Sequence, residues 1–161
     1  YSVIRASVIG DGAKIEEHVT MNLSVIGEKA QVNCDAMMNL SVVGENALVS
    51  HGGGYQMCLF GRDCFVAIGA SMLDLSFGKS IKVQSNGERI DTGMHFLGVC
   101  IGERARIGNA VRLSYGTAVP NDAFLIGGLR DLIVDASGAI PSEPMKAKEG
   151  ALISARRKPR K

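Results

Sequence analysis

The chain has 161 residues, of which 46% are hydrophobic and 5% aromatic, enough for one domain with a continuous core and no second module. Its formal net charge of +2 hides an uneven distribution, because residues 1–145 are net acidic and the residues after Met145 are net basic. No apolar run approaches the length of a membrane span and no signal peptide pattern is present, so we exclude a membrane-spanning class and expect a soluble protein.

A short internal repeat dominates the first half of the chain. Residues 21–30 return seventeen positions later as residues 38–47, with only two changes. Such self-similarity is typical of a solenoid, because one unit cannot bury its apolar face alone and must stack on its neighbours. The same frame, in most copies an apolar pair followed by glycine, recurs with the glycines at Gly10, Gly27, Gly44, Gly61, Gly78, Gly102 and Gly127.

The apolar positions within each coil predict a three-sided cross-section. They follow one another at steps of six, six and five residues, as in Ile9, Ile15, Met21 and Ile26. A helix would instead place them three and four residues apart. The series continues through Val32, Met38, Val43, Val49, Tyr55, Phe60, Val66, Met72 and Phe77. We therefore predict short strands that pair in parallel with their equivalents one coil away, at about 4.8 Å.

The first residue falls partway through a coil in this frame. Aligning Ile4 with Met21 leaves Tyr1 inside a coil instead of at its start. Two explanations stay open at this point: a truncated N-terminal segment, or a longer protein that carries something else upstream.

The hexapeptide pattern itself, an aliphatic residue followed by glycine and by a small residue four places on, is seen at Ile26, Gly27 and Ala30. It resembles the left-handed parallel β-helix of the bacterial transferase hexapeptide-repeat superfamily, over residues 3–127. The left hand comes from the resemblance alone, since parallel crossovers are right-handed as a rule. The resemblance implies an all-β, three-sided solenoid of about six to seven coils that assembles as a homotrimer.

The resemblance extends to two kinds of transferase. One kind consists of sugar or acyl transferases, which implies acetyl-CoA or another acyl donor and a sugar as small-molecule partners. The other is the C-terminal domain of sugar nucleotidyltransferases, in which the solenoid mainly oligomerises or regulates a preceding catalytic domain. We divide the chain accordingly into a β-helix at residues 1–127, with an insertion at about 84–99, a C-terminal cap at 128–145 and a basic tail at 146–161.

The insertion carries a hairpin signal. Residues 81–91 alternate around Asn86 and Gly87, a pair suited to a two-residue turn because both positions accept positive φ. We predict a protruding β-hairpin, and two roles for it stay open. It lines a cleft against a neighbouring subunit, or it covers an exposed face.

A run of three glycines replaces the usual corner residues at Gly52, Gly53 and Gly54. The backbone there is permissive. It can bring amide groups close to a phosphate or a thioester carbonyl, or it can allow close approach of another chain. The strand-to-helix context of a nucleotide loop is missing, so the first reading rests on composition only.

Two columns of polar side chains run along the predicted stack. One contains the amides of Asn22, Asn39 and Gln56, and the other contains Ser24 and Ser41. We expect both to be hydrogen-bonded ladders with a structural role.

The C-terminal residues are expected to cap the solenoid, because its last coil would otherwise expose unpaired strand edges. The basic tail contains seven Lys and Arg side chains against Glu149 alone. It lacks interleaved aromatic residues, so we expect a solvated tail or a contact with the acidic solenoid, and not nucleic acid or a membrane surface, as its partner.

The four cysteines, Cys34, Cys58, Cys64 and Cys100, form no CxxC pair and no metal-type spacing. We therefore expect no disulfides and a reducing, cytoplasmic location. By phase, Cys64 and Cys100 are predicted to be small core residues.

Histidine is the catalytic candidate that the resemblance implies, as a general base toward a sugar hydroxyl or amine. His95 lies in the insertion and His51 follows Cys34 and Glu17 by phase, so these two are our candidate catalytic residues. His18 falls next to Asp35 and is expected to form a surface pair.

A metal site is the rival interpretation, since γ-type carbonic anhydrases share this fold and bind zinc through three histidines across a trimer interface. That arrangement is absent here. Glu17, Cys34 and His51 form a column, but equivalents about 4.8 Å apart would not all converge on one ion without large distortion. We predict no metal site.

Two functions from different classes stay open. The first is an oligomeric domain allied to acyl or sugar-nucleotide transferases, with any active site at subunit clefts. The family's usual Gly-x-Pro-Ala segment, which helps cover acetyl-CoA, is replaced here by residues 119–127, which leaves the donor undecided. The alternative is a non-catalytic assembly or scaffold module whose tail or hairpin contacts another macromolecule.

Overall fold

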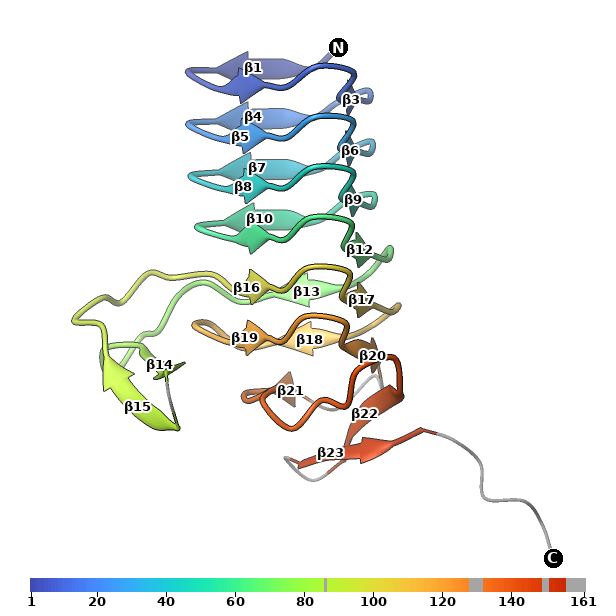
Figure 1. Ribbon diagram of the computed structural model, residues 1–161. Helices are drawn as coiled ribbons and strands as arrows, with labels where there is room; N and C mark the ends of the chain where they lie inside the picture. The colour runs from blue at the N-terminus through green and yellow to red at the C-terminus, as the bar shows by residue number, and fades with distance from the viewer. Residues whose placement is uncertain (86, 128–131, 149–150, 156–161) are drawn as a thin grey trace, which may run out of the picture.

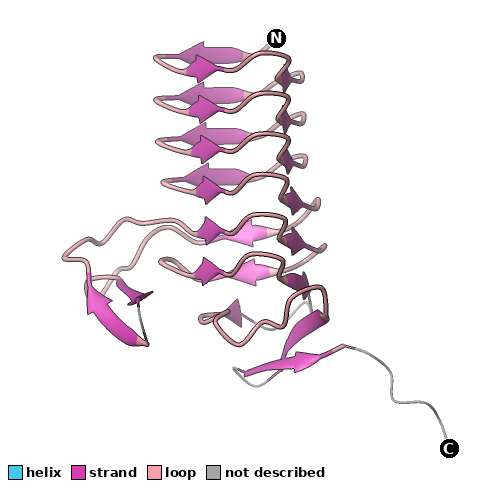
Figure 2. Cartoon of the chain, in the orientation of Figure 1, coloured by secondary structure: helices cyan, strands magenta, loops and turns pink. Residues whose placement is uncertain are grey.

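A computed structural model describes the whole chain except residues 86, 128–131, 149–150 and 156–161. Every regular element in the described part is a β-strand, and the strands form a column of stacked coils with the N-terminus at one end and the C-terminus at the other (Figures 1 and 2). This all-β stack of parallel coils confirms the predicted solenoid and is consistent with the left-handed β-helix.

The coils have three sides, which we call face A, face B and face C. Face A contains β1 (Val3–Arg5), β4 (Thr20–Asn22), β7 (Met37–Asn39) and β10 (Gly54–Gln56), and continues as β13 (Ser71–Met72), β18 (Arg112–Leu113) and β21 (Leu132–Ile133). Face B contains β2 (Val8–Ile9), β5 (Val25–Ile26), β8 (Val42–Val43), β11 (Leu59–Phe60), β16 (Cys100–Ile101) and β19 (Ala118–Val119).

Face C is the longest side. It contains β3 (Lys14–Ile15), β6 (Gln31–Val32), β9 (Leu48–Val49), β12 (Phe65–Val66), β17 (Arg106–Ile107), β20 (Phe124–Ile126), β22 (Pro144–Lys148) and β23 (Ala151–Ser154). Its sheet therefore has eight strands, and the stack is slightly longer than the six to seven coils expected from the glycine frame. The difference arises because β22 and β23 extend the face beyond Gly127, the last glycine of that frame.

From Met21 to Met72, the core positions predicted from the six, six and five spacing are buried, whereas Ile9 is 40% exposed and Ile15 is half-buried. Met21, Val32 and Val49 are fully buried, and the register pairs each with the residue seventeen positions away in the regular coils, as in Ile26 with Val43. One apolar side chain from each face thus enters the interior of every coil, and neighbouring coils share a continuous core.

The recurring glycine lies at the corner between faces B and C, where successive coils approach most closely. A side chain at Gly27 would place its Cβ 2.7 Å from the backbone nitrogen of Glu45 in the next coil, and Gly44 and Gly61 show the same crowding. Real Cβ atoms do not approach that closely, so the stacking distance itself requires glycine here.

The stack is interrupted after β13, where the chain leaves it as a long arm, residues 73–98 (Figure 1). Here the predicted phase of Phe77 is wrong: Phe60 pairs with Ile101 in the next coil, and Phe77 is 95% exposed. The departure from the coil thus begins well before residue 84. The predicted hairpin is confirmed within the arm as β14 (Lys82–Ser85) and β15 (Glu88–Asp91), which pair antiparallel; Asn86 lies outside the described residues.

The glycine run has a packing explanation at Gly53. Tyr55 points into the core, where it is 2% exposed and its ring meets Phe60 edge to face at 5.3 Å. A side chain at Gly53 would collide with the Tyr55 ring. Gly53 therefore makes room for an unusually large core residue.

The serine ladder is present, and the amide ladder is present between Asn22 and Asn39. Asn22 Nδ2 donates to Asn39 Oδ1 at 3.0 Å. At the corner between faces A and B, the Ser24 hydroxyl accepts from the Ser41 N–H at 3.2 Å, and the Ser41 hydroxyl accepts from the Cys58 N–H at 3.1 Å. The serine bonds satisfy buried backbone N–H groups between strands.

Of the two arrangements expected for the basic segment, its described part shows contact with the solenoid and not a solvated tail. β22 adds to face C beside β20, and β23 pairs antiparallel with β22, so the basic segment is a hairpin as far as Ser154. Alternation explains this, because Met145 and Ala147 are buried while Lys146 and Lys148 are exposed. The Lys and Arg residues at 156–161 lie outside the described residues.

Candidate functional site

The arm carries His95, the first candidate base. The segment that leaves the stack and the segment that returns to it are joined by backbone hydrogen bonds. The N–H of Leu97 donates to the carbonyl of Asp74 at 2.8 Å, and the N–H of Ser76 donates to the carbonyl of His95 at 2.9 Å. The His95 side chain is exposed. The arm therefore fixes the backbone of His95 while leaving its imidazole accessible to solvent.

An aspartate lies at the base of the hairpin, four residues before His95. The Ser80 hydroxyl donates to one oxygen of Asp91 at 2.7 Å, and the N–H of Gly93 donates to the other at 2.9 Å. These bonds lower the pKa of Asp91, with smaller contributions from the charges of Lys82 and His95. Asp91 is thus an oriented carboxylate at the base of the hairpin, held in its ionised form by the bonds that it accepts.

The arm returns to the solenoid and packs on its lower coils. Ile81 is 1% exposed, and a side chain at Gly116 would place its Cβ 2.6 Å from Ile81 Cγ2. The absence of a side chain at Gly116 therefore leaves the space that Ile81 of the arm occupies. The Thr92 hydroxyl adds a hydrogen bond at this contact, donating to the Ile81 carbonyl at 2.7 Å.

Between the arm and face B lies an apolar groove of about 240 Å³. Its lining comes from both sides and includes Met57, Leu59, Val83, Leu97, Cys100 and Ala118. Leu97 is two residues from His95, so the histidine lies near this groove along the chain. Cys100 is exposed on the outer side of β16, which corrects its predicted place in the core, because the chain re-enters the stack with Ile101, not Cys100, pointing inward.

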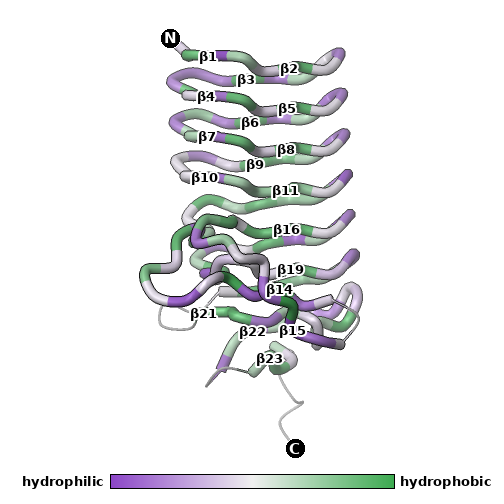
Figure 3. Tube along the Cα trace, turned by 90° about the vertical axis from the view of Figure 1, so that its left-hand side faces the viewer, coloured by the Kyte–Doolittle hydropathy of each residue, from purple (hydrophilic) through white to green (hydrophobic). Residues whose placement is uncertain are grey.

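The strands of face B are apolar along several coils (Figure 3). Successive strands present exposed branched side chains at Val8, Val25, Val42 and Leu59. At the adjoining corner, Leu40 is 48% exposed with a φ of 51°, and Leu23 repeats this arrangement. A leucine in the left-handed region is strained, so exposing it there is doubly unfavourable for an isolated chain. We call these six residues the apolar stripe.

His51, the second candidate base, lies at a different corner, between faces C and A. Donor atoms of Glu16, Cys34 and His51 lie within 4.8 Å of one another there. The Cys34 thiol donates to Glu16 Oε2 at 3.1 Å and to Glu17 Oε2 at 3.3 Å. These bonds raise the pKa of the Cys34 thiol to about 11, since the carboxylates hold its proton.

The two candidate histidines are therefore not brought together within one chain. The arm leaves between faces A and B, whereas His51 lies between faces C and A. His18 forms the expected surface pair, with its Nδ1 3.3 Å from Asp35 Oδ1. Sequence reasoning placed Glu17 in the column with Cys34 and His51, and the structure adds Glu16, whose position one residue earlier gave no periodic signal.

A larger groove of about 720 Å³ runs along face A, which sequence reasoning did not find. Its floor includes the amide ladder, and its rim includes Arg5 at one end and Asp74 at the other. The alternation of buried Met21 and Met38 with outward Asn22 and Asn39 was the available signal.

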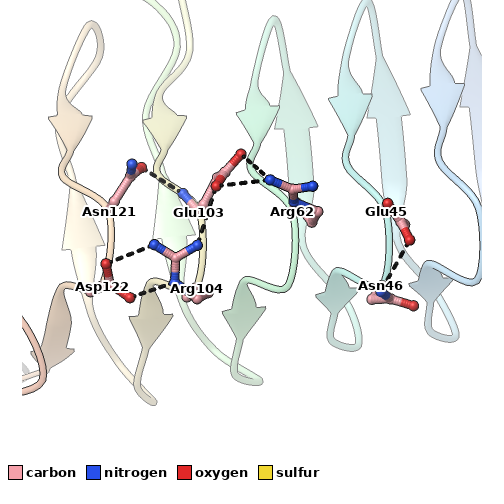
Figure 4. Close-up of polar contacts among 7 residues, drawn as sticks. All are labelled: Glu45, Asn46, Arg62, Glu103, Arg104, Asn121 and Asp122. Carbon is pink, nitrogen blue, oxygen red and sulfur yellow. Dashed lines mark hydrogen bonds and ion pairs between the residues drawn. The ribbon is translucent and has the colours of Figure 1, made fainter.

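A charged ladder follows the corner between faces B and C (Figure 4). Arg104 binds both oxygens of Asp122, at 2.6 and 2.9 Å, and Arg62 contacts Glu103 at 3.2 Å. Arg104 lowers the pKa of Asp122. All four side chains are paired and partly solvated, so we assign them a structural role with little net stabilisation.

The fold was compared with known proteins. No protein-family model matches the sequence, and a search of curated proteins found no match. Among solved structures, the acetyltransferase domain of PglB from Neisseria gonorrhoeae matches with a TM-score of 0.54 and 19% identity, over 88% of this chain and 54% of that chain. The same domain in complex with acetyl coenzyme A matches with a TM-score of 0.53.

A second structure is a variant of AntD, an N-acyltransferase from Bacillus cereus, in complex with dTDP-4-amino-4,6-dideoxyglucose and coenzyme A. It matches with a TM-score of 0.50 and 10% identity, over 98% of this chain and 84% of that chain. The chain shares the β-solenoid fold of these two structures. It spans only about half the length of the PglB domain. In its described part, no helix is long and apolar enough to cross a membrane.

Proposed function

We propose that this hexapeptide-repeat chain transfers an acyl group from acetyl-CoA, or a related thioester, to an amine or hydroxyl of a sugar nucleotide. The single observation that carries the proposal is the arm, which holds an accessible His95 close along the chain to an apolar groove on face B. The complexes of PglB with acetyl coenzyme A and of AntD with a dTDP-amino sugar and coenzyme A support the choice of reactants.

The groove suits the donor. A thioester donor presents a narrow chain that ends in an acyl group. The groove between Leu59 and Leu97 is lined almost wholly by apolar atoms. Excluding water there protects the thioester from hydrolysis. The acceptor and the nucleotide are polar and require the more solvated side of the arm, where His95 and Asp91 lie.

His95 is the proposed general base. Its imidazole takes the proton from the attacking amine or hydroxyl as the nucleophile adds to the thioester carbonyl. The C–S bond then breaks, the acyl group stays on the acceptor, and the leaving thiolate receives the proton. His51 is the second candidate for this role, because its neighbours Glu16 and Cys34 also form a polar cluster.

The active site is proposed to be completed by a second copy of the chain. The apolar stripe lies on face B, the same face that the groove and the arm share. Covering it removes exposed apolar area and offsets the strain at Leu23 and Leu40. Three subunits around an axis would each place an arm against a neighbour, which fits the expected trimer. The four free cysteines favour a cytoplasmic location.

The test is a thermal-shift series on the purified chain with acetyl-CoA, dTDP-sugars and UDP-sugars, followed by an acyl-transfer assay. A ligand that binds only the folded state raises the melting temperature. We expect a rise with acetyl-CoA, and a loss of turnover of about 10²- to 10⁴-fold in His95→Gln. His18→Gln is the matched control, because His18 is an exposed histidine paired only at the surface.

The alternative function is a non-catalytic scaffold. No melting shift with any donor, together with unchanged assembly in His95→Gln, would favour it. A loss of turnover in His51→Gln but not in His95→Gln would move the base to the other corner.

A further inference from the structure

The corner between faces C and A gathers three different metal-binding side chains from three successive coils. Glu16 precedes β4, Cys34 precedes β7 and His51 precedes β10. Each offers a ligand atom, and these atoms lie within 4.8 Å of one another. We propose that Glu16, Cys34 and His51 bind a divalent metal ion of the zinc type. The inference does not depend on the transferase proposal.

The donor set fits zinc chemically. Zinc accepts thiolate sulfur, imidazole nitrogen and carboxylate oxygen together, with bonds of about 2.0 to 2.3 Å. Ligand atoms around a tetrahedral ion of that size are about 3.3 to 3.8 Å apart. Cys34 Sγ and Glu16 Oε2 are already 3.1 Å apart, so movements of about an ångström bring the three donors into place.

The repeat spacing does not prevent convergence, contrary to our expectation from the sequence. That expectation assumed three side chains in one phase, stacked about 4.8 Å apart. Glu16 lies one residue earlier in its coil, and the Cys34 thiol donates a hydrogen bond to its carboxylate across the coils. The three side chains are half-buried or exposed, so small adjustments need no repacking of the core.

The charges also balance. Without a metal ion, the Cys34 thiol is neutral and donates its proton toward Glu16 and Glu17. A divalent ion replaces that proton, so that the thiolate and Glu16 together supply two negative charges and His51 supplies a neutral nitrogen. The released proton goes to solvent. The fourth position of the ion faces solvent, since His51 is exposed.

The ion would clamp the N-terminal coils. Tying Glu16 to His51 spans three coils, so bound metal adds stability across them. The consequence is a measurable rise in melting temperature with zinc.

The experiment uses the full chain, purified and freed of metal with a chelator, and titrated with ZnCl₂ and with CoCl₂. We expect one ion per chain, a rise in melting temperature, and with cobalt a thiolate charge-transfer band. Cys34→Ser, His51→Gln and Glu16→Gln should each weaken binding by more than the roughly 10- to 100-fold that loss of a ligand's hydrogen-bond partner costs.

The matched controls are Cys100→Ser and His95→Gln, which remove an exposed cysteine and an exposed histidine away from this corner. Both should bind zinc as the unmodified chain does. Circular dichroism shows whether each variant keeps its fold. Absence of saturable one-to-one binding, or zinc affinity and a cobalt band that persist in a folded Cys34→Ser, would overturn the proposal.

Discussion

The corner that holds His51 and the arm that holds His95 are built in opposite ways. His51 belongs to a regular coil, where seventeen-residue register stacks it over the coils of Cys34 and Glu16. His95 belongs to the arm, residues 73–98, which leaves the stack. A few backbone hydrogen bonds hold the arm together, and the buried side chain of Ile81 packs it against the coils. The repeat therefore determines which side chains lie together at the corner. The arm, in contrast, can carry functional residues without disturbing the core.

This difference has consequences for stability. A change within a coil disturbs two neighbouring coils at once, because backbone and core are shared along the column. A change on the arm acts on one local unit, whose opening need not unfold the coils. Four variants, from the largest expected effect to the smallest, examine this contrast.

The largest effect is expected in the coils. Gly27→Ala places a Cβ 2.7 Å from the Glu45 backbone nitrogen, where no flexible side chain can yield. We expect a loss of about 3 kcal/mol in the free energy of unfolding, measured by denaturant titration. Gly54→Ala is the control, because a Cβ there meets nothing within 4 Å. Equal midpoints for the two variants would contradict the crowding argument.

On the arm, Ile81→Ala should open the arm while the coils stay folded. Truncating this buried side chain leaves a cavity over Gly116 and costs about 2 to 4 kcal/mol of local stability. Hydrogen exchange should rise in residues 73–98 and stay unchanged in β5 and β8. Ile90→Ala, at a 50% exposed position on the same hairpin, should have little effect. Global unfolding in Ile81→Ala would show that arm and coils form one unit.

A smaller effect is expected at the apolar stripe. Leu40→Asn relieves strain, since Asn tolerates a φ of 51° better than Leu does, so the isolated subunit should gain up to about 1 kcal/mol. Assembly should weaken at the same time, as measured by sedimentation velocity. Ile68→Asn, which removes a 52% exposed apolar residue away from face B, should leave assembly intact. Weakening by both variants alike would refute the stripe as the specific contact.

The smallest effect concerns pH. The pKa of Asp91 is lowered in the folded arm by Ser80 and Gly93, so its contribution to stability is present above the unfolded pKa, about 3.9. That contribution is lost as the pH falls through the lower folded value. Ser80→Ala should raise the pKa of Asp91 toward its ordinary value, as followed by carboxyl NMR titration. An unchanged pKa would show that the Ser80 bond does not act on this group.

Much of the fold was predictable because the coil is periodic. Met21 and Val32 are buried where the spacing placed them, and the Asn86-Gly87 pair marked the hairpin. Phe77 was misplaced because its Ser-Phe-Gly context copies the frame locally, while the decision to leave the stack depends on how the arm packs on Gly116. Local sequence does not report such distant packing.

The candidate sites were less predictable than the coils. The phase rule brought His51 to Cys34, yet it favoured Glu17 over Glu16, because reach and rotamer decide which carboxylate oxygen meets the thiol. The groove beside the arm joins Leu59 to Leu97, two residues far apart in sequence with no shared period. Sites made by one repeat are thus readable, whereas sites between a repeat and an insertion need the structure.

The most direct measurement is hydrogen exchange of the full chain with and without acetyl-CoA. We predict new protection in the arm and along the groove, at Leu97, Gly98 and Gly116, with no change at the corner of Cys34 and His51. Protection at that corner instead, or no protection anywhere, would contradict the assignment of the donor site to the arm.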